Sequence, residues 1–147
     1  MIRLVLDSSY AVSWAFADER TPECLRVLRA LATGEAEALV SPLWFFEISN
    51  VLLVAEKRKR LTLEQSEAFL ELLGSLPIRE SGRPVAEIPE TLLILSRTQG
   101  LTAYDAAYLD LAQYEGGLPL ATLDADLEKA AKRSGLLVQA DILKSLP

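Results

Sequence analysis

Four acidic residues could do chemistry together in this chain, because each stands where an ordinary surface charge is not expected. They are Asp7, Glu47, Asp105 and Asp124. Two carboxylates ~4 Å apart repel by about 4 kcal/mol at an effective dielectric near 20, and a hard divalent cation relieves that repulsion. Mg²⁺ or Mn²⁺ in an all-oxygen shell activates a bound water and neutralises charge in the transition state of phosphodiester cleavage. The residue types therefore indicate metal-dependent chemistry on phosphate esters.

Asp105 interrupts the apolar face of a predicted helix in the segment LTAYDAAYLDLA, residues 101–112. Leu101 and Leu109 lie four residues before and after it, and this spacing places the three side chains on one face. An unpaired buried charge is costly, so Asp105 needs a partner or incomplete burial. Asp110, five residues further on, points away from this face and is expected to be an ordinary surface charge.

The other three acids have comparable positions. Glu47 shares a face with apolar residues on the most hydrophobic predicted helix, and Asn50, the only asparagine, follows one turn later. Asp7 ends the first predicted strand, and Asp124 follows the predicted strand 118–123. Ligands of parallel sheets bind beyond the carboxyl ends of the strands, so these two acids stand where a site is expected.

Each acid also has a purely structural interpretation. Asp7 and Asp124 could cap the helices that follow them. Asp126 would then be a first-turn acid that suits the helix dipole. Glu47 could pair with a buried arginine, and Asp105 could cap its own helix or pair in the same way. The two interpretations differ on whether the four carboxylates converge on one place.

Composition excludes several kinds of chemistry. The chain has 147 residues, a net charge of −6 and no histidine, which rules out a Ser-His-Asp triad, a Cys-His pair and histidine acid–base catalysis. The single cysteine, Cys24, cannot form a disulfide within the chain or a thiolate metal site, and it favours a cytoplasmic location. Carboxylates, hydroxyls, other polar groups or a metal must then do the work. Ser9 and Thr122 offer hydroxyls to water or phosphate, unless they only cap helices.

The central helix raises the question of a membrane or a nucleic-acid partner. Residues 39–55 carry one charge and precede the basic run Lys57 to Arg60, as membrane spans often do. The segment is short of the ~20 apolar residues that a span needs, and Glu47 near its middle would cost about 2.5–3.5 kcal/mol. A buried helix is the better interpretation, and no membrane partner is expected. The basic run is interpreted as a solvated helix end or as a guide for a nucleic-acid backbone.

Short β-rich runs alternate with helical patterns along the chain. Strands are predicted at residues 2–6, 37–41, 77–80, 118–123 and 135–139. Helices are predicted at 8–18, from Pro22 to Gly34, from about Pro42, from Thr62 to about Gly74, at 84–99, from 101, at 126–134 and at the C-terminus. This alternation predicts an α/β fold. We expect a single domain over residues 1–147, with three α/β/α layers and a central, mostly parallel sheet of four to five strands.

The order of these motifs resembles the PIN-domain ribonucleases, and above all the compact toxins of VapBC-type toxin–antitoxin pairs. DSS follows the first strand, ExxN lies on the central helix, and YDAAYLDLA precedes ATLDADL. The resemblance covers residue 2 to about residue 140. It implies an acidic quartet that binds Mg²⁺ or Mn²⁺, with the first and third acids as the best matches to direct ligands: Asp7, Glu47, Asp105 and Asp124.

The resemblance also assigns supporting positions and partners. Thr122 matches a hydroxyl residue two before the last acid, and Asp126 matches a more variable extra acid. Proteins of this kind are usually homodimers that cut single-stranded regions of RNA. A cognate antitoxin wraps and inhibits them.

Two other functions stay open on the sequence alone. A PIN-like module could bind RNA or protein without cutting, although all four acids are present. Asp7 at the end of a first strand is also typical of aspartyl-nucleophile phosphohydrolases, but DSS lacks their second acid two residues on. The sequence therefore favours a Mg²⁺- or Mn²⁺-dependent endoribonuclease, the toxin of a toxin–antitoxin pair.

Overall fold

Four parallel strands form the centre of the structure, a computed structural model that describes residues 1–147. In spatial order they are β3 (Ile78–Glu80), β2 (Ala36–Val40), β1 (Ile2–Leu6) and β4 (Leu120–Ala121). Every pairing is parallel, so all four strands end at the same edge of the sheet. The predicted α/β fold with a parallel central sheet is confirmed.

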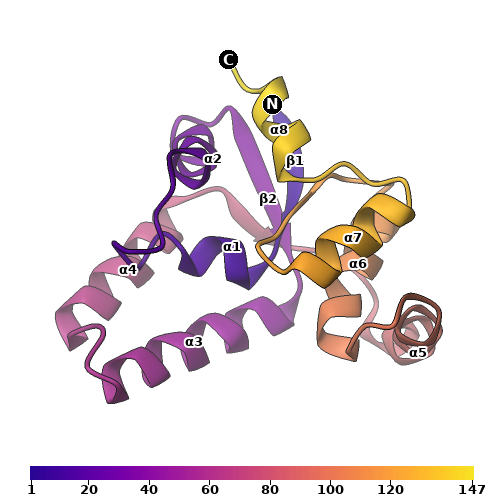
Figure 1. Cartoon of the computed structure of the whole chain (residues 1–147), viewed down its shortest axis with the longest axis horizontal. Coiled ribbons are helices and arrows are strands. Elements are labelled where there is room, and N and C mark those ends of the chain that lie inside the picture. The colour runs from indigo at the N-terminus through magenta and orange to yellow at the C-terminus, as the bar shows by residue number, and fades with distance from the viewer.

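Helices flank this sheet. They are α1 (Ser8–Val12), α2 (Pro22–Ala32), α3 (Pro42–Lys57), α4 (Leu63–Ser75), the 3₁₀ turn η1 (Val85–Glu87), α5 (Ile88–Gln99), α6 (Ala103–Tyr114), α7 (Ala125–Arg133) and α8 (Gln139–Ser145). In Figure 1, α2 and α8 lie near the two termini, α3 and α4 at the lower left, and α5, α6 and α7 at the right. None of the helices combines the length and the apolar composition needed to cross a membrane.

Local signals in the sequence fix most helix ends. The hydroxyl of Thr21 accepts the N–H of Cys24 at the start of α2. Thr62 and Gln65 form a capping box at the start of α4. Gly100 ends α5 in the left-handed conformation, with φ of 67°, which glycine adopts at no steric cost. The predicted helix 84–99 begins with the turn η1 and continues as α5.

The first helix is much shorter than the predicted helix 8–18. Trp14 and Phe16 are both buried, yet residues two apart on an α-helix point in different directions. The chain leaves the helix after Val12, and the Ser13 hydroxyl bonds the carbonyl of Tyr10. Burial of both aromatic side chains in the core therefore overrides the helical pattern.

The predicted fifth strand, residues 135–139, is also wrong. Val138 forms only an isolated parallel bridge with Leu120. Its N–H donates a hydrogen bond to the carboxylate of Asp141, in the first turn of α8, with an N···O distance of 3.1 Å. The helix cap thus takes the donor that a longer strand would use, and β4 is only two residues long.

Candidate active site

The paired ends of β1 and β4 place two of the four predicted acids on neighbouring strands. Leu6 lies opposite Ala121 in the register, and the N–H of Asp7 donates to the carbonyl of Ala121 at 3.0 Å. Asp7 follows β1 directly, and Asp124 begins α7 shortly after β4. Both acids therefore lie at the carboxyl-end edge of the sheet.

Hydroxyl groups surround the carboxylate of Asp7, which is only 5% exposed. Its Oδ2 accepts hydrogen bonds of 2.6 Å from Ser9 Oγ and 2.6 Å from Thr122 Oγ1. Longer contacts of 3.4 Å reach its Oδ1 from Ser8 Oγ and from the N–H of Ser9. Asp7 does cap α1, but its strongest bonds are those that fix the orientation of the carboxylate.

Thr122 and Ser9 bridge the two strand ends. The fully buried Thr122 hydroxyl donates to Asp7 and accepts the N–H of Asp124 at 3.0 Å. In parallel, the Ser9 hydroxyl donates to Asp7 and accepts the N–H of Leu123 at 3.0 Å. Both predicted hydroxyl residues therefore lie at the acids, and both hold them in place.

Glu47 approaches the same edge from α3. The hydroxyl of Tyr108, on α6, donates to Oε1 of Glu47 and accepts the N–H of Ser8 at 3.4 Å. Burial raises the pKa of the half-buried Glu47, and the charges of Asp7 and Asp105 raise it further, against the bond from Tyr108. Burial and the bond to Glu47 raise the pKa of Tyr108, so its hydroxyl is a donor at neutral pH.

Asp105 projects from the first turn of α6 and is half-buried. Thr102 caps this helix by accepting the N–H of Asp105 at 3.2 Å. Burial raises the pKa of Asp105, and the charges of Asp124, Asp7 and Asp126 add to the increase. The carboxylate of Asp105 is therefore close enough to Asp7 and Asp124 for their negative charges to raise its pKa.

No cation of the chain neutralises this cluster. Every ion pair in the structure involves other carboxylates. The structural interpretation in which Glu47 and Asp105 pair with a buried arginine is therefore wrong. Four acids from β1, α3, α6 and the end of β4 share one edge of the sheet with no positive side chain bonded to them.

The donors of this cluster fit a hard divalent cation. They are all oxygens, and their unneutralised charge is what Mg²⁺ or Mn²⁺ would relieve. No three acidic side chains surround a common point in this structure, and three of the four carboxylates have hydrogen-bond partners within the protein. Hydroxyls hold Asp7, Tyr108 holds Glu47, and the N–H of Leu127 donates to Asp124 at 2.8 Å.

The two remaining supporting residues are exposed. Asn50, one turn after Glu47 on α3, lines a pocket with Val51 and Arg58 that none of the four acids lines. Asp126 lies in the first turn of α7, and its charge acts on Asp105. The structure thus brings Asp126 near the cluster but does not bring Asn50 to it.

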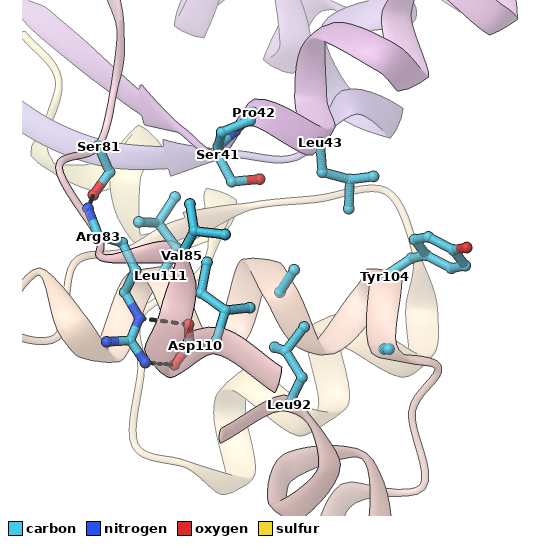
Figure 2. Close-up of a pocket in the computed structure, with 13 residues that line it drawn as sticks. Ser41, Pro42, Leu43, Ser81, Arg83, Val85, Leu92, Tyr104, Asp110 and Leu111 are labelled. Atoms are coloured by element: carbon cyan, nitrogen blue, oxygen red, sulfur yellow. Dashed lines mark hydrogen bonds and ion pairs between the residues drawn. The ribbon is translucent and has the colours of Figure 1, made fainter. Parts of the chain in front are cut away.

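Asp110 is not the surface charge that the sequence predicted. It is 5% exposed and forms a bidentate pair with Arg83, with N···O distances of 2.9 and 3.0 Å (Figure 2). The prediction failed because α6 packs against β1 and β4 and also against α5, so two of its faces are buried. Arg83 lies in a loop, and no spacing in the sequence indicated it.

An apolar pocket of about 320 Å³ lies beside this ion pair. Leu43 of α3, Leu92 of α5 and Tyr104 of α6 are among the residues that line it (Figure 2). Tyr104 directly precedes Asp105, and Leu43 stands one turn before Glu47. The pocket and the acidic cluster are therefore built on the same two helices.

The four cations of the basic run at the end of α3 differ in whether they form ion pairs. Arg60 bonds Asp18 at 3.2 Å and Glu19 at 3.5 Å, and its guanidinium lies over the ring of Phe16. The three preceding cations form no ion pair and are exposed: Lys57, Arg58 and Lys59. Arg60 is therefore a structural residue, whereas the other three are available to a ligand.

Comparisons with known proteins agree with this fold. The model of the PIN domain matches residues 4–133. A curated relative, Ribonuclease VapC3 of Pyrobaculum aerophilum, is 30% identical over 127 residues, which cover 86% of this chain and 92% of the relative. The crystal structure of PAE2754, also from Pyrobaculum aerophilum, superimposes with a TM-score of 0.69 at 23% identity. That match covers 99% of this chain and 89% of the other.

Proposed function

Since this chain belongs to the PIN-domain family, we propose that it is a metal-dependent endoribonuclease that cleaves single-stranded regions of RNA. The observation that carries the proposal is the cluster of Asp7, Glu47, Asp105 and Asp124, which share one sheet edge and have no cationic partner. RNA as the substrate is supported by the name of the curated relative, a ribonuclease.

In this proposal Asp7 and Asp105 are the direct ligands of Mg²⁺ or Mn²⁺, and Glu47 and Asp124 complete the site. The ion supplies an activated water and charge neutralisation at the phosphate. The chain supplies orientation. Ser9 and Thr122 fix the carboxylate of Asp7 through bonds of 2.6 Å. No histidine is present to act as a base, so proton transfer falls to carboxylates and water.

We further propose that the protein is the toxin of a toxin–antitoxin pair and acts in the cytoplasm. Its partner would be a cognate antitoxin that blocks the acidic edge. The VapC relative supports this assignment. Co-purification of the chain with the product of a neighbouring gene, and loss of cleavage in that complex, would be the supporting result.

A homodimer is the proposed assembly. Several apolar side chains of η1 and α5 are exposed, namely Val85, which lines the pocket of Figure 2, and Leu93 and Ile94, at 70%, 54% and 54%. A second copy of the chain that covers this surface would bury them. The pocket lined by Val85 is itself mostly apolar, and exposed apolar surface of this kind often marks an interface.

Cleavage of a mixed single-stranded RNA pool in Mn²⁺ tests the activity. Wild type should cut, and Asp105→Asn, prepared identically, should not. Asp18→Asn is the matched control, because Asp18 is 74% exposed and its surface pair with Arg60 lies outside the cluster. Equal cleavage by wild type and Asp105→Asn would point to a contaminating nuclease or another site, and would overturn the proposal.

A further inference from the structure

Tyr108 joins the three elements that carry Asp7, Glu47 and Asp105. It is 1% exposed and lies on α6, one turn after Asp105. Its hydroxyl donates to Glu47 of α3 and accepts the N–H of Ser8, the first residue of α1. One oxygen atom thus connects positions that lie 61 and 100 residues away in the sequence.

Glu47 needs such a restraint. The negative charges of Asp7 and Asp105 act on it, and no lysine or arginine pairs with it. Its side chain has three rotatable bonds and is half-buried, so repulsion favours rotamers that turn the carboxylate toward water. The hydrogen bond from Tyr108 opposes this movement by holding one carboxylate oxygen.

Burial restricts what else Tyr108 can do. A side chain that is 1% exposed cannot stack on a nucleotide or contact a phosphate. Its hydroxyl also already has two partners, the N–H of Ser8 and the carboxylate of Glu47. Any effect of this hydroxyl on the site must therefore pass through Glu47 or through the start of α1.

We propose that Tyr108 is a positioning residue whose hydroxyl holds Glu47 at the acidic cluster and thereby sets the affinity of the cluster for a divalent cation. The inference rests on the proposed function of the cluster as a metal site. Groups that hydrogen-bond to metal-binding side chains fix their orientation, and their loss typically weakens metal binding or activity about 10–100-fold.

The test is the Mn²⁺ dissociation constant, measured by calorimetry on the full chain freed of metal by chelation. Tyr108→Phe should weaken binding by at least about 10-fold. Tyr10→Phe is the matched control, because Tyr10 is 2% exposed and its raised pKa comes from burial and nearby charges rather than from a hydrogen bond. An unchanged dissociation constant in Tyr108→Phe would overturn the inference.

Two further variants test whether Tyr108 acts through Glu47. Adding Tyr108→Phe to Glu47→Ala should cause no additional loss of Mn²⁺ affinity, because the group being positioned is already gone. A further ~10-fold loss in the double variant would contradict the inference. Glu47→Asp keeps the charge but shortens the side chain away from Tyr108. It should lose affinity about as Tyr108→Phe does, and it tests the same bond if that variant fails to fold.

The outcomes separate this inference from the proposed function. Wild type that binds no Mn²⁺ would overturn both. Wild type that binds Mn²⁺ and cuts RNA, together with a Tyr108→Phe variant of equal affinity, would overturn only the role of Tyr108. Thermal unfolding of each variant shows that the comparison is made between folded proteins.

Discussion

Thr122 donates a hydrogen bond of 2.6 Å to Asp7, a residue 115 positions away, across the paired ends of β4 and β1. The same hydroxyl accepts the N–H of Asp124. It therefore fixes two members of the acidic cluster relative to each other. The site depends on the pairing of two short strand ends as much as on the acids themselves.

Thr122→Val should reduce cleavage about 10–100-fold, because it frees the Asp7 carboxylate. It should also lower the free energy of unfolding by about 1–3 kcal/mol, since a buried N–H and a buried carboxylate each lose a partner. Thr122→Ser keeps the hydroxyl and is the matched control. RNA cleavage rates and urea unfolding check both effects. Wild-type activity in Thr122→Val would show that Asp7 needs no such support.

Glu47 and Asp105 should make the metal-free protein less stable as the pH rises. Glu47 and Asp105 have raised pKa values in the folded state, chiefly through burial and then through neighbouring acids. The folded chain therefore holds more protons than the unfolded chain from about pH 4 upward, and the free energy of unfolding falls across that window. Added Mn²⁺ should offset the loss at neutral pH.

Urea unfolding in a chelator over a series of pH values measures this effect. The double variant Glu47→Gln/Asp105→Asn lacks both titrating groups. It should gain stability relative to wild type as the pH increases. A difference between the two proteins that does not vary with pH would mean that the acids of the cluster are not coupled as described.

Arg83→Ala should destabilise the fold by about 3–5 kcal/mol, because it leaves the charge of Asp110 buried without a partner. The two side chains are 11% and 7% exposed. Arg79→Ala is the matched control, since Arg79 is 70% exposed and its pair with Glu37 lies at the surface, where such pairs contribute ~0–1 kcal/mol. Denaturant unfolding compares them. Equal losses in the two variants would argue against a structural role specific to the buried pair.

Replacement of Lys57, Arg58 and Lys59 by Gln should weaken RNA binding and flatten its dependence on salt, because fewer counterions are released from the phosphates. Arg60→Gln alone should affect stability more than binding, since Arg60 is engaged with Asp18 and Phe16. Binding titrations at several salt concentrations distinguish the two. A salt dependence unchanged in the triple variant would leave the run as an ordinary helix end.

Charged substitutions on α5 test the proposed dimer surface. Leu93→Glu and Ile94→Glu place carboxylates on exposed positions of α5, so the monomer should fold normally while the dimer dissociates. Light scattering gives the mass of each protein, and Leu25→Glu, on the exposed face of α2, serves as the control. A wild-type mass equal to one chain would exclude the dimer.

Local spacing predicted most of what positions the acids. The strands 2–6 and 37–41, the caps at Thr21 and Thr62, and the strand-end acids all follow from residue types within a few positions of one another. The proximity of Ser9 and Thr122 to Asp7 also followed, because parallel strands end at one edge.

Local spacing in the sequence could not predict contacts between distant segments. Arg83, in the loop before η1, meets Asp110 of α6, which lies 27 residues away in the sequence. The sequence pattern around Tyr108 is typical of an ordinary core aromatic residue. The one feature that could have indicated its role is that a buried tyrosine hydroxyl requires a hydrogen-bond partner. The early end of α1 depends on burial of Trp14 and Phe16, which a helical pattern conceals.

The most direct test of the central claim is an anomalous difference map from a crystal of the wild-type protein soaked in Mn²⁺. The account predicts a Mn²⁺ peak at the carboxyl-end edge of the sheet, with ligands from Asp7 and Asp105, and no such peak in Asp105→Asn. A wild-type map with Mn²⁺ elsewhere, or with none at the four carboxylates, would contradict it.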